Sequence, residues 1–404
     1  MLTSAGAALA GAGCAPVPSG QEERHDAVFV SLGTRRVVAM VDQVGNRVLG
    51  ETSLGPLGWE GAAGNLVVGP GGEVAILPLS DHSTTLGILR PTPPATSGVH
   101  GPGAPAMTLA ALPLAGEVPA RSGASGPEAD MLPMAVADRR GRAYVVVAHR
   151  WYRIPTRIAV VDLSTARMLR RLEIAPPGEH VTALAAAPDG GRLYVATWRP
   201  SEAAQDEHSP PRTGAGRILV LDSESGGLVA RRELGEGEMA TQLVAAAPSA
   251  GAASQLAMGS AEAGVLYAAV QGRNPSGADG DWGTVFGKSR LLALDSAQLY
   301  ELDVWSLARP TSHMVLHPHG PRMYLLNGTV WPSPLSLESV ALNTGAVKQH
   351  LSVPDGVRGL ALGRNGSLYV LDAHGHRLWR YDTLTQRLVG TVTLDAAPVA
   401  VGAL

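Results

Sequence analysis

The sequence predicts an all-β fold, a seven-bladed β-propeller of four-stranded antiparallel blades, closed by pairing of the C-terminal strand with the N-terminal blade. Two recurring landmarks and one incomplete unit at each end of the chain predict it. The first landmark is an apolar residue followed by an aromatic one in a second strand, and its aromatic members are Phe29, Tyr144, Tyr194, Tyr267, Tyr324 and Tyr369. The second closes a third strand with a turn-favouring residue: Asp42, Asp162, Asp222, Asp295, Asn343 and Asp382.

The clearest copy of the repeat runs from Val181 to Leu234. It alternates short apolar strands with turns such as Pro188-Asp189-Gly190, a pattern typical of antiparallel strands. Four such strands cannot bury both faces of their sheet alone, so copies must stack side by side.

Seven units follow one another along the chain: His25–Leu54, Asn65–Gly116, Asp130–Ala175, Val181–Gly235, Thr241–Leu307, Ser312–Val353 and Val357–Leu394. The first unit has a second, third and fourth strand but lacks a first. The chain ends with Pro398–Leu404, which reads as a first strand with no second strand after it. We therefore expect the two ends to complete one blade, which removes an exposed sheet edge.

The N-terminal segment, residues 1–24, is set apart from the single predicted propeller domain at 25–404. It contains the one cysteine of the chain, Cys14, at the end of an apolar run of small residues that resembles a bacterial lipoprotein signal peptide. This resemblance implies lipidation at Cys14, export, and a tether over Ala15–Arg24. The basic stretch that usually opens a signal peptide is missing, so a start upstream or a simple flexible tail are the alternatives.

Composition excludes several classes of function. The net charge of −3 gives no sign of nucleic acid binding or of electrostatic attraction to an anionic membrane. A single cysteine rules out an intrachain disulfide, a redox pair and a thiolate zinc site. There is also no nucleophile elbow, phosphate-binding loop or dinucleotide fingerprint, and we predict no cofactor.

The stretch from Pro188 to Asp222, with its turn, its Leu-Tyr-Val strand and its closing Asp, resembles the YVTN-type propeller repeat of exported bacterial proteins. The resemblance covers nearly all of residues 26–404. It implies the propeller fold and no single activity, because such propellers include lactonase-like proteins, the heavy chain of methylamine dehydrogenase, surface-layer proteins and binding scaffolds.

Insertions point to one face of the predicted propeller. From the aromatic landmark to the Asp or Asn takes 13 residues in the first and last units, but 18, 28, 28 and 19 in the third to sixth. Loops between second and third strands emerge on the same side as the connections between blades, here called the loop face. We expect binding there, on segments 54–64, 116–130, 149–156, 198–216, 273–289 and 328–334.

Five of the seven tryptophans map to the loop face, some beside arginines. Aromatic and arginine side chains together are typical of recognition surfaces. The candidate ligand contacts are Trp151, Arg153, Trp198, Arg199, Trp282 and Trp331. The alternative is that these tryptophans cap blade ends and pack the loops.

Two histidine clusters invite a metal or catalytic interpretation, and we predict neither. His317-Pro318-His319-Gly320 aligns with Ala187-Pro188-Asp189-Gly190, so His319 replaces a turn Asp on the face opposite the insertions. Asp372 to His376 lies in the short loop of the last unit and reads as a polar hairpin turn.

The leading hypothesis is a monomeric, exported, lipid-anchored scaffold that binds a protein or a small or polymeric ligand on its loop face. A lactonase-like hydrolase with a site at the mouth of the central channel is the alternative. Against it, the lactonase-like proteins tend to have a Glu after the Leu-Asn pair, where this chain has Gly328. A third possibility is a subunit of a periplasmic redox complex whose cofactor belongs to a partner.

Overall fold

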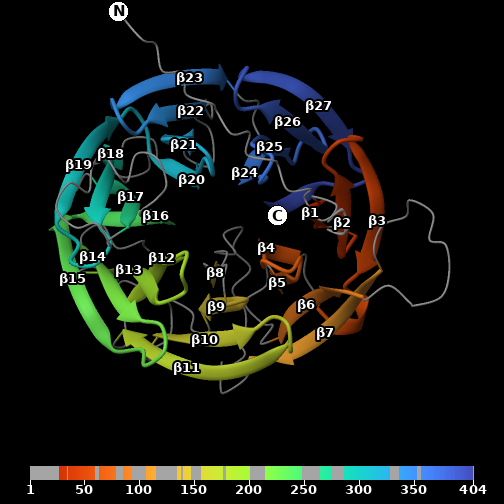
Figure 1. Cartoon of the computed structure of the whole chain (residues 1–404), viewed down its shortest axis with the longest axis horizontal. Coiled ribbons are helices and arrows are strands. Elements are labelled where there is room, and N and C mark those ends of the chain that lie inside the picture. Colours follow the sequence, from red (N-terminus) through yellow and green to blue (C-terminus); the bar gives the residue numbers. More distant parts are fainter. Residues whose placement is uncertain are drawn as a thin grey trace, which may run out of the picture.

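The computed structural model describes residues 27–33, 35–59, 63–78, 85–92, 106–114, 134–137, 140–146, 156–175, 179–200, 214–247, 264–273, 286–327, 336–352 and 356–403. Within these ranges the chain forms seven four-stranded antiparallel sheets arranged in a ring (Figure 1). The predicted seven-bladed propeller is confirmed. The one helix among the described residues is a short 3-10 turn, η1 (Gly55–Leu57), and none of the described helices is long and apolar enough to span a membrane.

The blades are numbered in chain order and each is written from its innermost strand outward. Blade 1 contains β28 (Pro398–Ala403), β1 (Ala27–Leu32), β2 (Val37–Asp42) and β3 (Arg47–Ser53). Blade 2 contains β4 (Ala63–Val68), β5 (Val74–Pro78), β6 (Thr85–Pro91) and β7 (Met107–Pro113). Blade 3 contains β8 (Met134–Ala137), β9 (Arg142–Val146), β10 (Thr156–Asp162) and β11 (Arg167–Ala175). Blade 4 contains β12 (His180–Ala186), β13 (Arg192–Pro200), β14 (Gly214–Asp222) and β15 (Leu228–Glu236).

The remaining blades follow the same order. Blade 5 contains β16 (Glu238–Ala246), β17 (Val265–Arg273), β18 (Phe286–Asp295) and β19 (Glu301–Leu307). Blade 6 contains β20 (Thr311–Leu316), β21 (Arg322–Asn327), β22 (Ser336–Ala341) and β23 (Ala346–Ser352). Blade 7 contains β24 (Val357–Leu362), β25 (Ser367–Asp372), β26 (Arg377–Asp382) and β27 (Arg387–Thr393).

Blade 1 closes the ring as the two incomplete ends of the sequence predicted. β28 pairs antiparallel with β1, so that Val28 lies opposite Ala403 and Leu32 opposite Pro398. The N–H of Gly33 donates to the carbonyl of Ala397 at 3.1 Å and extends this pairing by one bond. The C-terminal strand therefore lies at the centre of the ring (Figure 1).

Apolar clusters between adjacent blades hold the ring together. One cluster joins Tyr194 and Val220 of blade 4 to Leu243 and Leu266 of blade 5, and comparable clusters join the other neighbouring blades. The landmark aromatics contribute directly, since Tyr144, Tyr194, Tyr267 and Tyr369 are among the largest fully buried side chains of the described residues. The repeat thus encodes the inter-blade core.

The aspartates that close the third strands fix the turns that follow them. Oδ1 of Asp382 accepts hydrogen bonds from the N–H groups of Leu384 (2.9 Å) and Thr385 (2.6 Å). The N–H of Ser225 reaches Asp222 in the same way at 2.7 Å. These hydrogen bonds favour the charged carboxylate and lower the pKa of both aspartates.

Blade 6 departs from the predicted pattern. β22 ends at Ala341, which pairs with Arg322 as Asp222 pairs with Arg192 in blade 4. The prediction that Asn343 closes this strand is wrong, because Asn343 lies two residues further on, within the turn. Position Ala341 has no carboxylate to accept the turn N–H groups.

A β-bulge recurs in the innermost strands of blades 4 to 7. In each of these strands one residue falls outside the pairing register, and these residues are Thr182, Thr241, Ser312 and Arg358. All four lie near the start of their strand, close to the loop face. Bulges of this kind re-aim side chains at barrel rims and next to functional sites.

Candidate binding face

The longest connections between second and third strands are in blades 4 and 5, where both strands extend beyond the loop face. In blade 7 this pairing ends at Asp372 opposite Arg377. In blade 4 it continues past the aligned pair Thr197 and Arg217 to Pro200 opposite Gly214. In blade 5 it continues past Val270 and Arg290 to Arg273 opposite Phe286. Two neighbouring hairpins therefore rise from one side of the loop face.

A buried carboxylate supports the base of the blade 4 hairpin. Glu179 is 2% exposed and accepts hydrogen bonds from Nε of Arg217 (2.6 Å), from Nη2 of Arg217 and from the hydroxyl of Thr197 (2.5 Å). Its backbone carbonyl also accepts the hydroxyl proton of Thr156 in blade 3, at 2.8 Å. Because Arg217 lies on β14 and Glu179 precedes β12, the pair ties the third strand to the innermost one.

Blade 5 repeats this support with other residues. Oε2 of Glu238 accepts hydrogen bonds from Nη2 of Arg290 (2.7 Å) and from the N–H of Gly235 (2.8 Å). Glu179 and Glu238 each lie three residues before the bulge of their inner strand, and Arg217 and Arg290 each lie five residues before the closing Asp. The two ion pairs are therefore equivalent by repeat position.

The hairpin of blade 4 is also packed tightly against the connection to blade 5. Gly237 donates from its N–H to the carbonyl of Gly214 at 2.8 Å. A Cβ added at Gly216 would collide with the backbone of Glu238 and Met239. Only a residue without a side chain permits this approach, which fixes one hairpin relative to the next blade.

Blade 6 has a network of hydrogen-bonded polar side chains at the corresponding height. The hydroxyl of Thr311 donates to Oδ1 of Asn327 (2.7 Å), and Nδ2 of Asn327 donates to Oε2 of Glu338 (2.6 Å). The hydroxyl of Ser336 donates to the other oxygen of Glu338 at 3.0 Å. Sequence reasoning missed Glu338, since only strand pairing brings β22 beside Asn327.

Two of the bulge residues join the innermost strands of neighbouring blades near the ring axis. Oγ1 of Thr182 donates to the carbonyl of Ala240 in the next blade at 2.6 Å, and Oγ1 of Thr241 donates to that of Thr311 at 3.0 Å. Arg358 takes the same position in β24 and is exposed. The inner rim near the loop face is therefore polar and has a cationic group in blade 7.

His313 lies next to this rim on β20. Its ring is close to β24, because a Cβ added at Gly359 would come within 3.9 Å of Nε2 of His313. Burial lowers the pKa of His313 to about 4, which keeps the imidazole neutral at physiological pH. Nδ1 of His313 is 3.4 Å from the hydroxyl oxygen of Ser312.

The Ser312 hydroxyl is not arranged as a nucleophile activated by His313. Its single proton is donated to the carbonyl of Leu326 at 3.1 Å, and the contact with His313 is longer. A nucleophilic serine needs its proton directed at the base. No group of three or more potential metal ligands forms among the residues that the structure describes.

The structure places two of the predicted contact residues. Trp198, near the end of β13, is 4% exposed, and its ring lies over Gly214. Arg199, the next residue, is exposed. For Trp198 the structure thus gives the packing position that the sequence offered as the alternative, while Arg199 is accessible to a partner. The predictions for Trp151, Arg153, Trp282, Trp331 and Cys14 lie outside the described residues.

The two histidine clusters occupy turns. Nε2 of His317 is 3.0 Å from the hydroxyl of Thr383, and Nε2 of His319 is 2.9 Å from the carbonyl of Arg364, both in blade 7 on the face opposite the hairpins. At the other cluster, Asp372 is 4% exposed and accepts the N–H of Gly375 at 2.7 Å.

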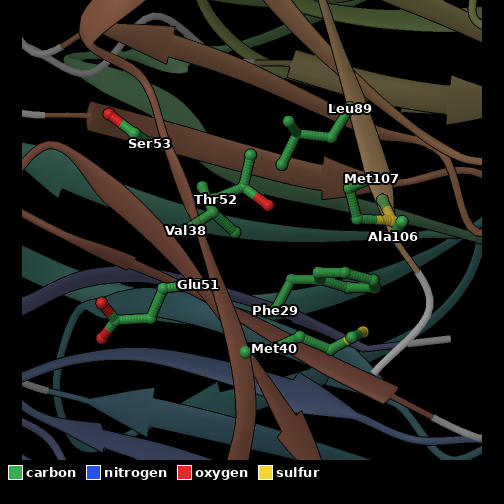
Figure 2. Close-up of a pocket in the computed structure, with 10 residues that line it drawn as sticks. Phe29, Val38, Met40, Glu51, Thr52, Ser53, Leu89, Ala106 and Met107 are labelled. Atoms are coloured by element: carbon green, nitrogen blue, oxygen red, sulfur yellow. The ribbon is translucent and has the colours of Figure 1, made fainter. Parts of the chain in front are cut away.

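A cavity of about 370 Å³ lies between blades 1 and 2 and is lined by residues of their outer strands, away from the ring axis. Figure 2 shows Phe29, Met40, Leu89 and Met107 around it, with Glu51 at one side. The Glu51 carboxylate pairs with Arg35 at 3.1 Å. No sequence motif predicts this cavity, because it forms between residues of two different sheets.

Comparison with known proteins supports the fold. No family model matches the chain, and no curated protein matches it by sequence. Apo AztD from Citrobacter koseri superposes with a TM-score of 0.54 at 14% identity, over 94% of this chain and 97% of that one. The hydrazine synthase of Kuenenia stuttgartiensis gives 0.52 at 14% identity over 83% and 87%.

A further similar structure is the dihydro-heme d1 dehydrogenase NirN in complex with DHE. It superposes with a TM-score of 0.52 at 12% identity, over 96% of this chain and 76% of that one. At such identities the likeness establishes a shared propeller fold and transfers no activity.

Proposed function

We propose that this chain is an exported, lipid-anchored propeller scaffold of the YVTN type that binds a protein or a small or polymeric ligand on its loop face. The observation that supports binding is the pair of projecting hairpins of blades 4 and 5, each braced by a buried or half-buried ion pair. The propeller core is complete without these two extended strand pairs, so their extension favours a role in presenting a binding surface. Rigid supports suit recognition, because they reduce the ordering cost of binding.

Arg199 and the polar inner rim give this face its chemical character. The exposed Arg199 projects from the blade 4 hairpin and the exposed Arg358 from the rim of blade 7. Two unburied guanidinium groups on one face favour a partner with carboxylate or phosphate groups, since arginine binds such groups in a bidentate manner.

The test uses a photo-crosslinking amino acid introduced at Arg199 in the full chain within producing cells. We expect a crosslinked partner or ligand adduct at position 199. The matched control is the same substitution at Glu224, an exposed turn residue on the opposite face. Adducts of equal yield at both positions, or at Glu224 alone, would contradict binding on the loop face.

Anchoring is tested separately by feeding cells with labelled palmitate. The label is expected in the wild-type chain and absent from the Cys14→Ser variant. Incorporation in both, or in neither, would remove the lipid anchor from the proposal while leaving the crosslinking result to stand on its own.

The hydrolase alternative has one supporting observation, the neutral His313 beside the polar rim, and one against it, the Ser312 hydroxyl that donates to Leu326. A lactone panel followed by pH-stat titration distinguishes the two functions. The scaffold hypothesis expects no difference in rate between wild type and His313→Gln.

A further inference from the structure

The turns between third and fourth strands differ in the side chain at their tip in the six blades where the structure describes that turn. These turns lie on the face opposite the hairpins, here called the turn face. The tip is the second residue after the closing position, and the tips of the described turns are Val44, Ser164, Glu224, Ala297, Asn343 and Leu384. Among these described turns, only those of blades 1 and 7 place a large apolar side chain at the tip, with Val44 81% and Leu384 87% exposed.

Nothing in the fold requires these two side chains. The turn geometry is set by Asp42 and Asp382, whose Oδ1 atoms accept the N–H groups of Val44 (2.9 Å) and Leu384 (2.9 Å) themselves. Polar or small residues occupy the same tip in blades 3 to 6. Exposed apolar residues in the fourth strands do not distinguish blades in this way, because they recur at Leu169, Leu228, Val347 and Leu388.

The two tips belong to neighbouring blades at the point where the ring is closed. Nη1 of Arg380 in blade 7 donates to the carbonyl of Gln43, and Gly390 on β27 packs against the side chain of Asn46. In Figure 1, β27 and β3 lie next to each other at this seam. The apolar tips therefore form a local feature of one sector of the turn face.

The chain enters the propeller in the same sector. Ala27, the first residue of β1, pairs with Asp42, which immediately precedes the turn that carries Val44. Twelve residues separate Cys14 from Ala27 in the sequence. Fully extended, such a segment spans roughly 40 Å at about 3.3–3.6 Å per residue, so a lipid on Cys14 holds this sector close to a bilayer.

Arginines accompany both tips. Arg47 follows the turn of blade 1 and is 65% exposed, and Arg387 follows the turn of blade 7 and is exposed. Nε of Arg47 lies 3.6 Å from Oδ2 of Asp42, and the Oδ1 atoms of Asp42 and Asp382 accept turn N–H groups. Apolar tips with arginine beside them match the interface of a membrane, where apolar side chains insert and cations meet anionic headgroups.

We propose that the turn face of blades 1 and 7 rests on the lipid bilayer, with Val44 and Leu384 inserted at the interface and Arg47 and Arg387 among the headgroups. This orientation rests on the proposed anchor at Cys14. It turns the loop face, with its two hairpins, away from the membrane and toward partners. The anchor then fixes orientation as well as location, because a second contact supplements a single lipid attachment.

The experiment uses the lipidated full chain in vesicles of phosphatidylethanolamine and phosphatidylglycerol. A nitroxide label is attached to a single introduced thiol, in the variants Leu384→Cys, Val44→Cys, Asn343→Cys and Ser164→Cys. Lipidation consumes the Cys14 thiol, so the introduced cysteine is the only site of labelling. Collision rates are measured with oxygen, which concentrates in lipid, and with a water-soluble nickel chelate.

We expect the ratio of oxygen to nickel collisions to be several-fold higher at positions 384 and 44 than at position 164 across the ring, with position 343 intermediate. Equal, water-like ratios at all four positions would overturn the proposal. Dipolar broadening between labels at position 384 would also overturn it, in favour of a second copy of the chain. A second labelled thiol per chain would show that Cys14 is free, which is failure of the anchor and not of the contact surface.

A second pair of variants checks the same surface without labels at its tips. Val44→Ser with Leu384→Asn installs residues that the same turn already accepts in blades 3 and 6, so folding is preserved. With the label placed at Arg387→Cys, the collision ratio is expected to fall several-fold in this background. An unchanged ratio would show that the tips do not hold the sector at the bilayer.

Discussion

Glu179 and Arg217 form a two-point contact at the base of the blade 4 hairpin, with Nε of Arg217 2.6 Å from Oε1 of Glu179 and its Nη2 bonded to Oε2. The aligned pair in blade 5 joins Glu238 to Arg290. Both pairs connect the innermost strand of a blade to its third strand, across the second. The hairpins that project from the loop face are therefore supported at their base by ion pairs between the innermost and the third strand.

Replacing Arg217 with Met is expected to destabilise the chain. Glu179 would remain buried without its cation, and breaking a buried pair on one side typically costs about 3–5 kcal/mol. Because Arg217 keeps a partly exposed side chain, the lower end of that range is expected. Urea denaturation followed by tryptophan fluorescence measures the change.

The matched control for this variant is Arg231→Met, which removes an exposed arginine 4.0 Å from Glu233. A loss of at most about 0.5 kcal/mol is expected there. If both variants lost the same stability, the bracing role of the Glu179 pair would have to be abandoned.

Gly216→Ala tests the close packing between the blade 4 hairpin and the next blade. The added methyl group would strike the backbone of Glu238 and Met239, which cannot rotate away. Overpacking of this kind costs about 1–3 kcal/mol. Gly320→Ala is the control, since its Cβ would meet only His317 Nδ1 at an ordinary 3.4 Å. Melting curves that shift equally for both variants would argue against a specific contact at Gly216.

His313 links stability to pH. Burial lowers the pKa of His313 in the folded chain to about 4, below the ordinary value of 6.5, so the unfolded chain binds the proton more readily. The contribution of the neutral His313 to the unfolding free energy is complete above about pH 6.5. As the pH falls toward 4, up to about 3 kcal/mol of this contribution is lost. The difference in unfolding free energy between wild type and His313→Gln should therefore change between pH 7 and pH 4; a constant difference would exclude the link.

The turn of blade 6 offers a stabilising substitution. Ala341 stands where five other blades have an Asp whose carboxylate accepts turn N–H groups, as Asp382 does for Leu384 and Thr385. Ala341→Asp should add such bonds at a net gain of about 0.5–1.5 kcal/mol. The reverse change, Asp382→Ala, should cost a similar amount. The melting temperature is expected to rise for Ala341→Asp and to fall for Asp382→Ala. A melting temperature of Ala341→Asp below that of the wild type would contradict this prediction.

Trp198 and Arg199 are neighbours in sequence with different expected roles. Trp198→Ala should lower the unfolding free energy by about 3–5 kcal/mol, because a buried indole leaves a cavity over Gly214. Arg199→Ala should leave unfolding nearly unchanged and weaken capture at the loop face. If the two variants were equally stable in urea, Trp198 would be a surface contact residue and not part of the core.

Much of the fold follows from local sequence. The aromatic landmark, the closing Asp and the missing first strand of unit 1 are all short-range signals, and they predict seven blades and their closure. Short-range sequence signals do not predict a contact when the two residues that form it lie in different strands. Asn343 matches the landmark by residue type, although Ala341 occupies the paired position, and the contact between Glu338 and Asn327 depends on the pairing of β22 with β21.

The sequence by itself determined the number of blades, the closure and the face that receives the insertions, because these depend on period and on loop length. Only the tertiary structure decided which residues of that face are accessible. It buried Trp198 over Gly214, left Arg199 exposed, and brought Glu179 to Arg217 and Glu238 to Arg290 across an intervening strand. Burial and pairing depend on the register between strands that lie far apart in the chain, and a repeat pattern does not specify which side chain meets which.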